Sequence, residues 1–318
     1  MTDVKKIATR DSYGNCLAEL SSVYKNLVVL DADLAHATKT INFKKACPER
    51  FVDCGIAEAN MIGVAAGLAA TGMIPFASSF AIFAAGRAFE QIRNSVGYPH
   101  LNVKIGATHA GVSVGEDGAT HQCNEDIALM RTIPKMVILN PSDDVEARAC
   151  VKAAIEHDGP VYLRFGRLPV PVINDHADYK FELGKGIVLR EGVDITVVVT
   201  GLPVSEVLQA ADELKEEGIS VRVINIHTIK PIDKALLQQA AKETGRIITV
   251  EEHYVYGGLG DAVIDAIIDT HPVPVYKIGV NDEYGFSGPA AELLEHFGFS
   301  SHKLKAAIKS VITNQSLK

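Results

Sequence analysis

The sequence predicts an α/β protein made of two consecutive domains, each with three α/β/α layers. Short apolar segments alternate with helical segments along the whole chain. The apolar segments are continuous runs, which is typical of parallel strands buried on both faces. The alternation stops once, at residues 168–179, where prolines and polar residues indicate a linker. We therefore expect a first domain at residues 1–180, with a linker at 168–180, and a second domain at residues 181–318.

The first half alternates helix and strand in a regular order. Residues 12–24 are amphipathic and predict a helix, and the apolar run 27–30 predicts a strand that leads into Asp31. Residues 58–71 are Ala, Gly and Met on most faces, and a helix that is apolar nearly all round is buried. The same patterns predict a strand into Asp53, strands at 74–79, 103–107, 136–139 and 161–165, and helices at 83–95, 124–132 and 143–157.

The second half shows the same alternation, so its sheet is expected to be mostly parallel. An initial strand at 186–190 is expected to form an antiparallel hairpin with the strand that begins at Ile195. The other expected strands are 195–200, 221–226, 247–251 and 275–278, and the expected helices are 204–217, 233–244, 259–268, 290–296 and 301–313.

Composition argues against several classes of protein, among them nucleic-acid-binding and membrane-spanning proteins. The chain has 318 residues, of which 47% are hydrophobic and 22% charged, which suits a globular protein with a full core. A net charge of −8 and the lack of a basic stripe argue against a nucleic-acid partner. No apolar run reaches the roughly 18–20 residues of a membrane span, and the N-terminus lacks the apolar core of a signal peptide, so we expect a cytoplasmic protein. The five scattered cysteines argue against a disulfide framework or a zinc site.

Polar side chains follow several of the expected parallel strands at their carboxyl ends. Ligands of such sheets bind in the crevice outside these ends. One polar group there is ordinary, but a set after successive strands suggests a shared crevice. The set comprises Asp31, Glu58, Ser78, Ser79, His109 and Arg164.

Glu58 has two interpretations from local sequence. It lies at the first turn of a buried helix, where a carboxylate complements the helix dipole or caps the first N–H groups. The alternative is a buried carboxylate directed at a ligand nitrogen. Local sequence does not decide between them.

The loop at residues 108–122 is the most informative segment. It contains two histidines, His109 and His121, and two acids, Glu116 and Asp117, in a glycine-rich path. Glycine allows tight turns and close approach to a ligand, and an ordered loop of this length is usually functional. Histidine can transfer protons near neutral pH. A metal cluster is the alternative, but no helix presents an H-x-x-x-H pair, so we favour a loop that handles a substrate.

Aromatic and basic residues add two weaker signals. Phe80 and Phe83 follow a strand end and are either ordinary helix core or a wall on which a flat heterocycle stacks. Arg10, Arg164 and Arg167 flank strand ends. An arginine binds phosphate or carboxylate through two parallel hydrogen bonds, although an isolated surface arginine more often forms an ion pair worth less than about 1 kcal/mol.

In combination these segments resemble the transketolase family of thiamine-diphosphate enzymes. The resemblance spans essentially the whole chain and matches the family's pyrimidine-binding domain followed by its C-terminal domain. In the first half it rests on Ala8-Thr9-Arg10, Asp31-Ala32-Asp33-Leu34, Gly55-Ile56-Ala57-Glu58, Ser78-Ser79-Phe80-x-x-Phe83, Thr108-His109, Gly115-Glu116-Asp117-Gly118-x-Thr120-His121-Gln122 and the strand end at Arg164. In the second half it rests on the segments 200–207 and 251–260.

The resemblance implies roles for individual residues. Glu58 would hydrogen-bond the ring nitrogen of the cofactor's aminopyrimidine and so promote formation of the thiazolium ylid. Cofactor contacts would also come from Ile56, Phe80 and Phe83. His109, Asp117 and His121 would act on the sugar hydroxyls and carbonyl. Arg10, Arg164 and His109 would contact a phosphate group of the substrate. Asp31 would also lie among the substrate contacts.

Asp31 departs from the family pattern, in which we expect a serine among the phosphate contacts. An acid would repel a phosphate dianion unless an arginine lay between them. The resemblance therefore leaves open whether the substrates are phosphorylated.

One family motif is missing from the sequence. The family holds the diphosphate and Mg²⁺, or Ca²⁺, in a separate N-terminal domain with a Gly-Asp-Gly motif, and this sequence contains no such motif. The resemblance thus implies the small subunit of a split transketolase, which transfers a two-carbon ketol unit between sugars or sugar phosphates. It further implies an N-terminal partner subunit and self-association, as an α2β2 assembly.

Three alternatives remain open at this stage. The chain could belong with the acyl-forming relatives, either 1-deoxyxylulose-5-phosphate synthase or the β subunit of 2-oxoacid dehydrogenases. It could instead be a regulatory paralogue without catalytic activity. His253 could suggest a metal site, but no further ligand follows at metal spacing, so we favour a structural or interface role.

Overall fold

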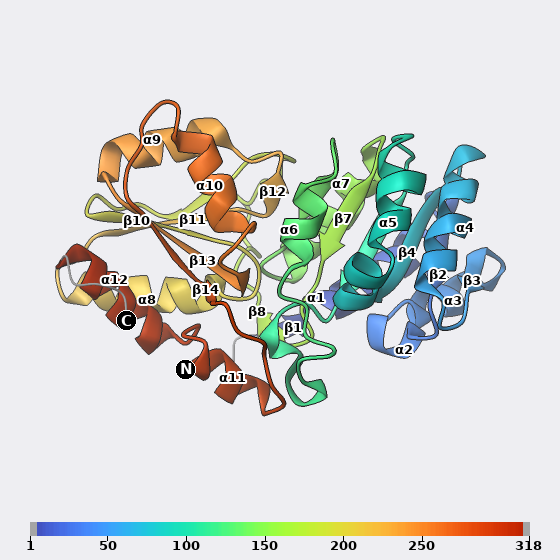
Figure 1. The fold of residues 1–318 in the computed structure, drawn as a ribbon, viewed down its shortest axis with the longest axis horizontal. Coiled ribbons are helices and arrows are strands. Elements are labelled where there is room, and N and C mark those ends of the chain that lie inside the picture. The colour runs from blue at the N-terminus through green and yellow to red at the C-terminus, as the bar shows by residue number, and fades with distance from the viewer. Residues whose placement is uncertain (1–4, 314–318) are drawn as a thin grey trace.

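The computed structural model describes residues 5–313 and contains two large sheets, each with helices on both faces (Figure 1). The seven-stranded sheet has the order β12-β6-β7-β5-β4-β2-β3. All neighbours in it are parallel except β12, which is antiparallel to β6. Its strands are β2 (Leu27–Asp31), β3 (Phe51–Asp53), β4 (Ile74–Phe80), β5 (Lys104–Thr108), β6 (Val137–Leu139), β7 (Val161–Arg164) and β12 (Thr228–Lys230).

Alternate residues of these strands enter two separate cores because successive side chains point to opposite faces. In β2, Leu27 and Val29 join one core, and Val28 and Leu30 join the other. The first core is covered by α1 (Thr9–Leu20), α3 (Ile41–Ala46) and α7 (Asp144–Glu156). The second is covered by α4 (Glu58–Ala70), α6 (Asp126–Arg131) and the segment η2-α5-η3 (Ile82–Arg87, Phe89–Gln91, Ile92–Gly97).

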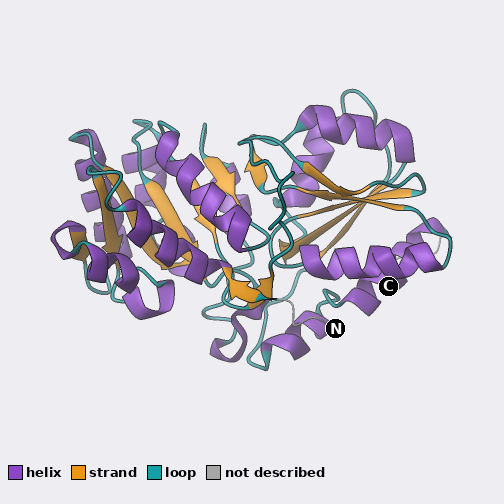
Figure 2. Ribbon diagram, turned by 180° about the vertical axis from the view of Figure 1, so that it is seen from behind, coloured by secondary structure: helices purple, strands orange, loops and turns teal. Residues whose placement is uncertain are grey.

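The five-stranded sheet has the order β14-β13-β10-β11-β9. Its strands are β9 (Ile187–Arg190), β10 (Ile195–Val199), β11 (Val221–Asn225), β13 (Ile247–Tyr254) and β14 (Val275–Val280). Figure 2 shows helices on either side of this sheet. One side has α8 (Val204–Glu216) and α12 (Ser301–Ile312), and the other has α9 (Lys234–Thr244) and α10 (Leu259–Ile267). Two of the helices begin at capping aspartates, α7 at Asp143 and α9 at Asp233.

The predicted fold class, two α/β units with mostly parallel sheets, is confirmed, but two predicted details are wrong. The first strand of the second half, β9, pairs with β11 and not with β10. Both edges of β10 are already taken by the parallel strands β11 and β13, so β9 joins the free edge of β11. The helix expected at 83–95 is a succession of π-helical and α-helical turns. Apolar spacing does not distinguish these turns because their periods are close.

Two short strands pair in ways that the patterns did not indicate, and one of them, β12, links the two halves of the chain. Within the expected linker, β8 (Pro169–Pro171) pairs with β1 (Lys6–Ala8). From the second half, β12 crosses to the edge of the first sheet. One core also spans both sheets, because it contains Ile105 of β5 together with Val198 of β10. The two halves are therefore joined by backbone pairing and by a shared core.

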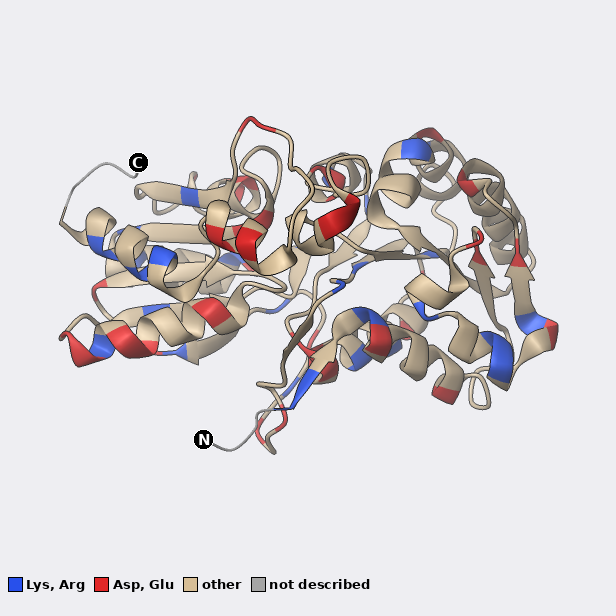
Figure 3. Cartoon of the chain, turned by 90° about the horizontal axis from the view of Figure 1, so that it is seen from below, with Lys and Arg blue, Asp and Glu red and all other residues tan. Residues whose placement is uncertain are grey.

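Charged residues of both signs occur in both halves of the chain, as Figure 3 shows. Within residues 5–313, no helix combines the length and the apolar character needed to cross a membrane.

Candidate active site

Side chains from separate segments meet at the carboxyl edge of the seven-stranded sheet. Phe80, at the end of β4, stacks on His109, just after β5, with ring centroids 3.8 Å apart. Phe83 lies parallel to Phe80 at 5.8 Å, and His121 meets the Phe83 ring edge-on at 5.3 Å. The structure thus brings together the predicted aromatic pair and both loop histidines.

His109 is held in one tautomer. Its Nε2 lies 2.8 Å from Arg10 Nη1, and its Nδ1 lies 2.9 Å from Thr108 Oγ1. Because arginine can only donate, Nε2 accepts and Nδ1 carries the proton. Burial, reinforced by the Arg10 charge, lowers the pKa of His109 to about 3, so the ring is neutral near pH 7. The backbone of His109 has a φ of 57°, a conformation that is uncommon outside glycine and tends to occur at functional sites.

Glu58 is buried at the start of α4 and forms an ion pair with Arg87. Arg87 Nη1 donates to both carboxylate oxygens, at 2.8 and 2.9 Å. The Arg87 guanidinium also lies over the Phe83 ring, 4.5 Å from its centroid. Among the described residues the Glu58 carboxylate accepts no backbone N–H, so the simple capping interpretation has no support. The carboxylate instead joins the aromatic pair through Arg87, which sequence reasoning did not single out.

Residues 109–123, called the catalytic loop after the role that we expected from the sequence, leave their acids exposed. The loop includes the short helix η4 (Val112–Asp117), and Asp117 lies at the end of that helix with its side chain exposed. Glu116 pairs with Arg167 at 2.9 Å. His121 is half-buried, and its Nδ1 lies 2.9 Å from Thr120 Oγ1. Asp117 and His121 are therefore accessible to a bound molecule.

The structure places Arg164 and Arg167 in different environments. Arg164 is 4% exposed; its Nε pairs with Asp126 at 2.9 Å, and its Nη2 donates to the carbonyls of Cys123 and Glu252. These internal bonds argue against the expected contact of Arg164 with a substrate phosphate. Arg167 has a side chain 33% exposed. Burial lowers the pKa values of both Arg10 and His109, and the Arg167 charge adds to this effect. Since Arg167 lies beyond the end of β7 and Arg164 is the last residue of that strand, their positions could have indicated which arginine is the more exposed.

Asp31 is also committed to internal contacts. Its side chain is fully buried and accepts hydrogen bonds from Thr38 Oγ1, Thr40 Oγ1 and the backbone N–H of Leu34, at 2.6–2.8 Å. Burial raises the pKa of Asp31 to about 6. The carboxylate therefore organises the turn after β2 (Leu27–Asp31), and the structure argues against the expected substrate contact and against repulsion of a phosphate.

Ile56, two residues before Glu58, is an exposed apolar residue. Its side chain is 76% exposed, and Val52 and Val64 are also exposed. On α4 (Glu58–Ala70), Gly63 and Gly67 face open space. A second chain could approach the α4 backbone closely at these glycines.

The residues present fit one end of thiamine diphosphate. Two aromatic rings at an interplanar angle of 11° and a buried carboxylate suit a flat aminopyrimidine with a ring nitrogen. Within residues 5–313 no group of three or more His, Cys, Asp or Glu side chains is suited to a metal ion. His253 donates from Nδ1 to the Tyr254 carbonyl and accepts at Nε2 from the Ala128 N–H, so it has a structural role.

Comparisons with known proteins agree with this geometry. Residues 5–172 match the family described as "Transketolase, pyrimidine binding domain", and residues 184–304 match "Transketolase, C-terminal domain". The chain is 48% identical over 301 residues to a putative transketolase C-terminal section of Methanocaldococcus jannaschii, and the match covers 94% of each chain. It is 41% identical to the 6-deoxy-6-sulfo-D-fructose transketolase subunit of Clostridium sp. strain MSTE9, over 97% of this chain and 96% of that one.

A solved structure gives the same result. It is described as a split gene transketolase in an inactive beta4 tetramer, and it superposes with a TM-score of 0.88 at 50% identity, covering 98% of this chain and 100% of the other. Two matched family domains and relatives aligned over nearly their whole length lead to one conclusion: this chain belongs to the transketolase family of transferases and corresponds to its C-terminal section.

Proposed function

We propose that this chain is the C-terminal subunit of a two-chain transketolase that transfers a two-carbon ketol unit from a ketose to an aldose. The observation that carries the proposal is the half-site around Phe83. There a buried carboxylate, an aromatic pair and two histidines meet, while residues 5–313 offer no metal cluster. In this proposal a second polypeptide supplies the diphosphate and metal contacts, which agrees with the chain's similarity to a split gene transketolase.

The proposed cofactor is thiamine diphosphate, with Mg²⁺ or Ca²⁺ held mainly by an N-terminal partner subunit. When bound, the cofactor supplies a nucleophilic carbon and an electron sink. Glu58 would accept a hydrogen bond from the pyrimidine ring, and Phe80 and Phe83, beside the exposed Ile56, would contact its flat faces. Because Glu58 is buried, its hydrogen bond to the ring would be stronger than one in water.

The proposed substrate contacts come from the catalytic loop and from Arg10. His121 and Asp117 are accessible and would bind sugar hydroxyls or the carbonyl group. Neutral His109 holds Arg10 with its guanidinium near the crevice, and Arg167 lies close enough to affect both. Two arginines favour a substrate with an anionic end, such as a phosphate or the sulfonate named for the Clostridium relative.

The proposed assembly is α2β2, with α4 (Glu58–Ala70) at the contact between copies of this chain. Ile56, Val52 and Val64 are exposed apolar residues on or just before α4, and Gly63 and Gly67 of α4 face open space, which suits close helix packing. The related split transketolase forms a tetramer of its β chains that is described as inactive. A chain that self-associates and lacks activity alone fits the need for a partner.

The test is reconstitution with a candidate N-terminal subunit carrying Gly-Asp-Gly, thiamine diphosphate and Mg²⁺. We expect ketol transfer from a panel of ketose donors only when both chains are present. Glu58→Gln should reduce kcat by about 100-fold or more, because the group that holds the pyrimidine loses its charge. Glu90→Gln is the matched control, since Glu90 is an exposed carboxylate on the neighbouring α5.

Two outcomes would overturn the proposal. Full activity of the Glu58→Gln pair would remove the assigned role of that carboxylate. Pyruvate decarboxylation without ketol transfer by the wild-type pair would place the chain with the acyl-forming enzymes.

A further inference from the structure

The catalytic loop (residues 109–123) follows an irregular path that its own backbone hydrogen bonds fix only in part. Four of its residues have φ between 57° and 85°, namely His109, Gly111, Gly115 and Gly118. Such positions interrupt regular helix or strand hydrogen bonding, so contacts from outside the loop add to the few backbone bonds within it. Those contacts come in large part from the second half of the chain.

Glu252 of β13 (Ile247–Tyr254) makes one of these contacts from a buried position. It is 3% exposed, and its Oε1 accepts a hydrogen bond from the Ser113 N–H at 2.5 Å. Its carboxyl group also packs directly against Gly111, where an added Cβ would overlap the Glu252 side chain. A side chain from the second sheet thus both bonds to the loop backbone and limits its path.

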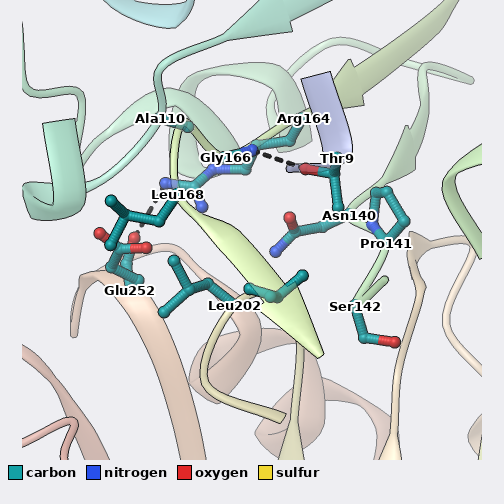
Figure 4. Close-up of a pocket in the computed structure, with 11 residues that line it drawn as sticks. Thr9, Ala110, Asn140, Pro141, Ser142, Arg164, Gly166, Leu168, Leu202 and Glu252 are labelled. Carbon is teal, nitrogen blue, oxygen red and sulfur yellow. Dashed lines mark hydrogen bonds between the residues drawn. The ribbon is translucent and has the colours of Figure 1, made fainter. Parts of the chain in front are cut away.

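The backbone of Glu252 fixes the other end of the loop. Arg164 Nη2 donates to the Glu252 carbonyl at 2.9 Å and to the Cys123 carbonyl at 3.3 Å. Cys123 in turn accepts from the Gly111 N–H at 2.8 Å, which closes the base of the loop. Figure 4 shows Arg164 and Glu252, joined by the hydrogen bond from Arg164 Nη2 to the Glu252 carbonyl, among the residues that line a small pocket, which also include Thr9 and Ala110.

A second contact from the same half supports the loop tip. Gln122 Nε2 donates to the Phe286 carbonyl at 3.0 Å, and Gly118 packs against Ser287. This contact lies nearer to Asp117 and His121, whereas Glu252 acts at Gly111 and Ser113, next to His109. Glu252 is therefore the residue whose loss should release the first turn of the loop.

We infer that Glu252 is a positioning residue, which holds the catalytic loop in the conformation that presents His109, Asp117 and His121. Glu252 itself is buried behind the loop and reaches the crevice only through the Ser113 N–H and Gly111. The inference assigns the second half of the chain a role in the site, although none of the proposed cofactor or substrate contacts comes from that half. The expected effect on catalysis rests on the proposed function, but the expected effect on loop order does not.

The test is hydrogen–deuterium exchange of the full chain, read by mass spectrometry in peptides from residues 109–123. Glu252→Met keeps the side-chain volume but removes the acceptor, and Glu252→Gln restores an acceptor oxygen. We expect exchange at residues 111–114 to rise about tenfold or more in Glu252→Met and to stay within about threefold of wild type in Glu252→Gln.

Glu251→Met is the matched control on the same strand. Glu251 is equally buried, but its oxygens accept from the N–H groups of Leu259 and Gly260 at the start of α10 (Leu259–Ile267). This variant should raise exchange around residues 259–260 and leave the catalytic loop unchanged. Equal loosening of the loop by both Met variants, or none by Glu252→Met, would overturn the inference.

The reconstituted two-chain enzyme provides the second readout. Glu252→Met should lower kcat/KM by about tenfold or more, with recovery in Glu252→Gln, because a released loop no longer orients the histidines. A loosened loop with unchanged kcat/KM would show that Glu252 has only a structural role. A wild-type pair without ketol transfer would count against the proposed function, and the exchange data would still decide whether Glu252 holds the loop.

Discussion

Arg87 Nη1 lies between the two carboxylate oxygens of Glu58, at 2.8 and 2.9 Å, while the Arg87 guanidinium covers the Phe83 ring. Glu58 is 2% exposed and the Arg87 side chain is 51% exposed, so the pair joins a buried anion to a cation at the surface. A pyrimidine ring that binds Glu58 must displace or share this arginine. The pair therefore keeps the carboxylate partnered when no cofactor is bound.

The Glu58–Arg87 pair should contribute measurably to stability. We expect a double-mutant cycle with Glu58→Gln and Arg87→Met to give a coupling energy of about 1–2 kcal/mol, between the values typical of exposed and buried pairs. The measurement is chemical unfolding of the chain alone. The matched control is Arg190–Asp212, a pair with both side chains about half exposed, whose coupling should stay below about 1 kcal/mol. Equal coupling energies in the two cycles would contradict the buried character assigned to Glu58.

His109 should make the protein less stable in acid. Its folded pKa of about 3 lies below the ordinary value of 6.5, because burial disfavours the charged ring. The unfolded chain therefore binds a proton first, and the stability from neutral His109 is lost as pH falls from about 6.5 towards 3. Replacement by Asn, which cannot titrate, should flatten the pH dependence by up to about 2.5 kcal/mol between pH 6.5 and 4.5.

Thermal unfolding of wild type and His109→Asn across this pH range provides the measurement. The control is His302→Asn, because His302 is an exposed histidine on α12 (Ser301–Ile312). A pH dependence that is identical in wild type and His109→Asn would mean that His109 already titrates normally. Nitrogen NMR of the wild-type ring should show a proton on Nδ1 and none on Nε2.

Arg167 should recognise the anionic end of the substrate. In the reconstituted enzyme, Arg167→Met should raise KM for a phosphorylated ketose about tenfold or more, because it removes a charge-assisted contact. KM for an unphosphorylated ketose should change less than about threefold, since the sugar contacts remain. Arg190→Met is the control, because Arg190 pairs with Asp212 on the outside of the second half. An equal rise in KM for both ketoses would exclude recognition of the anionic group by Arg167.

Periodic patterns were sufficient for most of the fold. The apolar runs that became β2, β4 and β10 and the amphipathic segment that became α8 each report a local preference repeated over several residues. The three-residue strand β12 (Thr228–Lys230) carries too short a pattern, and its place depends on the edge of a distant sheet. Local sequence predicted that β9 pairs with β10, its neighbour in the chain, whereas β9 pairs with β11. Local sequence does not show which strand edge remains free.

In the candidate site, too, local sequence predicted the positions of residues but not their partners from distant parts of the chain. The strand-end pattern predicted a shared crevice that includes His109, and the family resemblance implied that Phe80, Phe83 and His121 belong to the same site. The sequence did not reveal that Glu58 pairs with Arg87, 29 residues away. Nor did it reveal that the Asp31 carboxylate accepts hydrogen bonds from the Thr38 and Thr40 hydroxyls. Partners of buried charges depend on tertiary packing, so a residue type at a strand end does not show whether it faces the crevice or the core.

Glu146 lies where the two halves of the chain meet and should give the protein a pH-dependent stability of opposite sign to that of His109. The Glu146 carboxylate, on α7 (Asp144–Glu156), is fully buried and accepts hydrogen bonds from Ser142, from Asn225 of the second sheet at 2.8 Å and from Tyr179 at 3.2 Å. Burial raises the pKa of Glu146 from the ordinary 4.5 to about 7. The folded state thus retains a proton that the unfolded chain has lost, so this contribution is complete below pH 4.5 and is lost as pH rises through about 7.

Glu146→Gln removes this titratable group. It also places a side-chain NH2 group opposite the N–H donors of Ser142 or Asn225, where wild type has an acceptor oxygen. We expect the variant to have a lower free energy of unfolding than wild type. This difference in unfolding free energy should shrink by about 1–3 kcal/mol between pH 4.5 and 7, because wild type loses the contribution of protonated Glu146 over that range. Urea unfolding at intervals across this range provides the measurement, with Glu156→Gln, at an exposed position on the same helix, as the control. A stability difference that is constant with pH would show that Glu146 stays ionised throughout, and that its hydrogen bonds to Ser142, Asn225 and Tyr179 outweigh the cost of burying its charge.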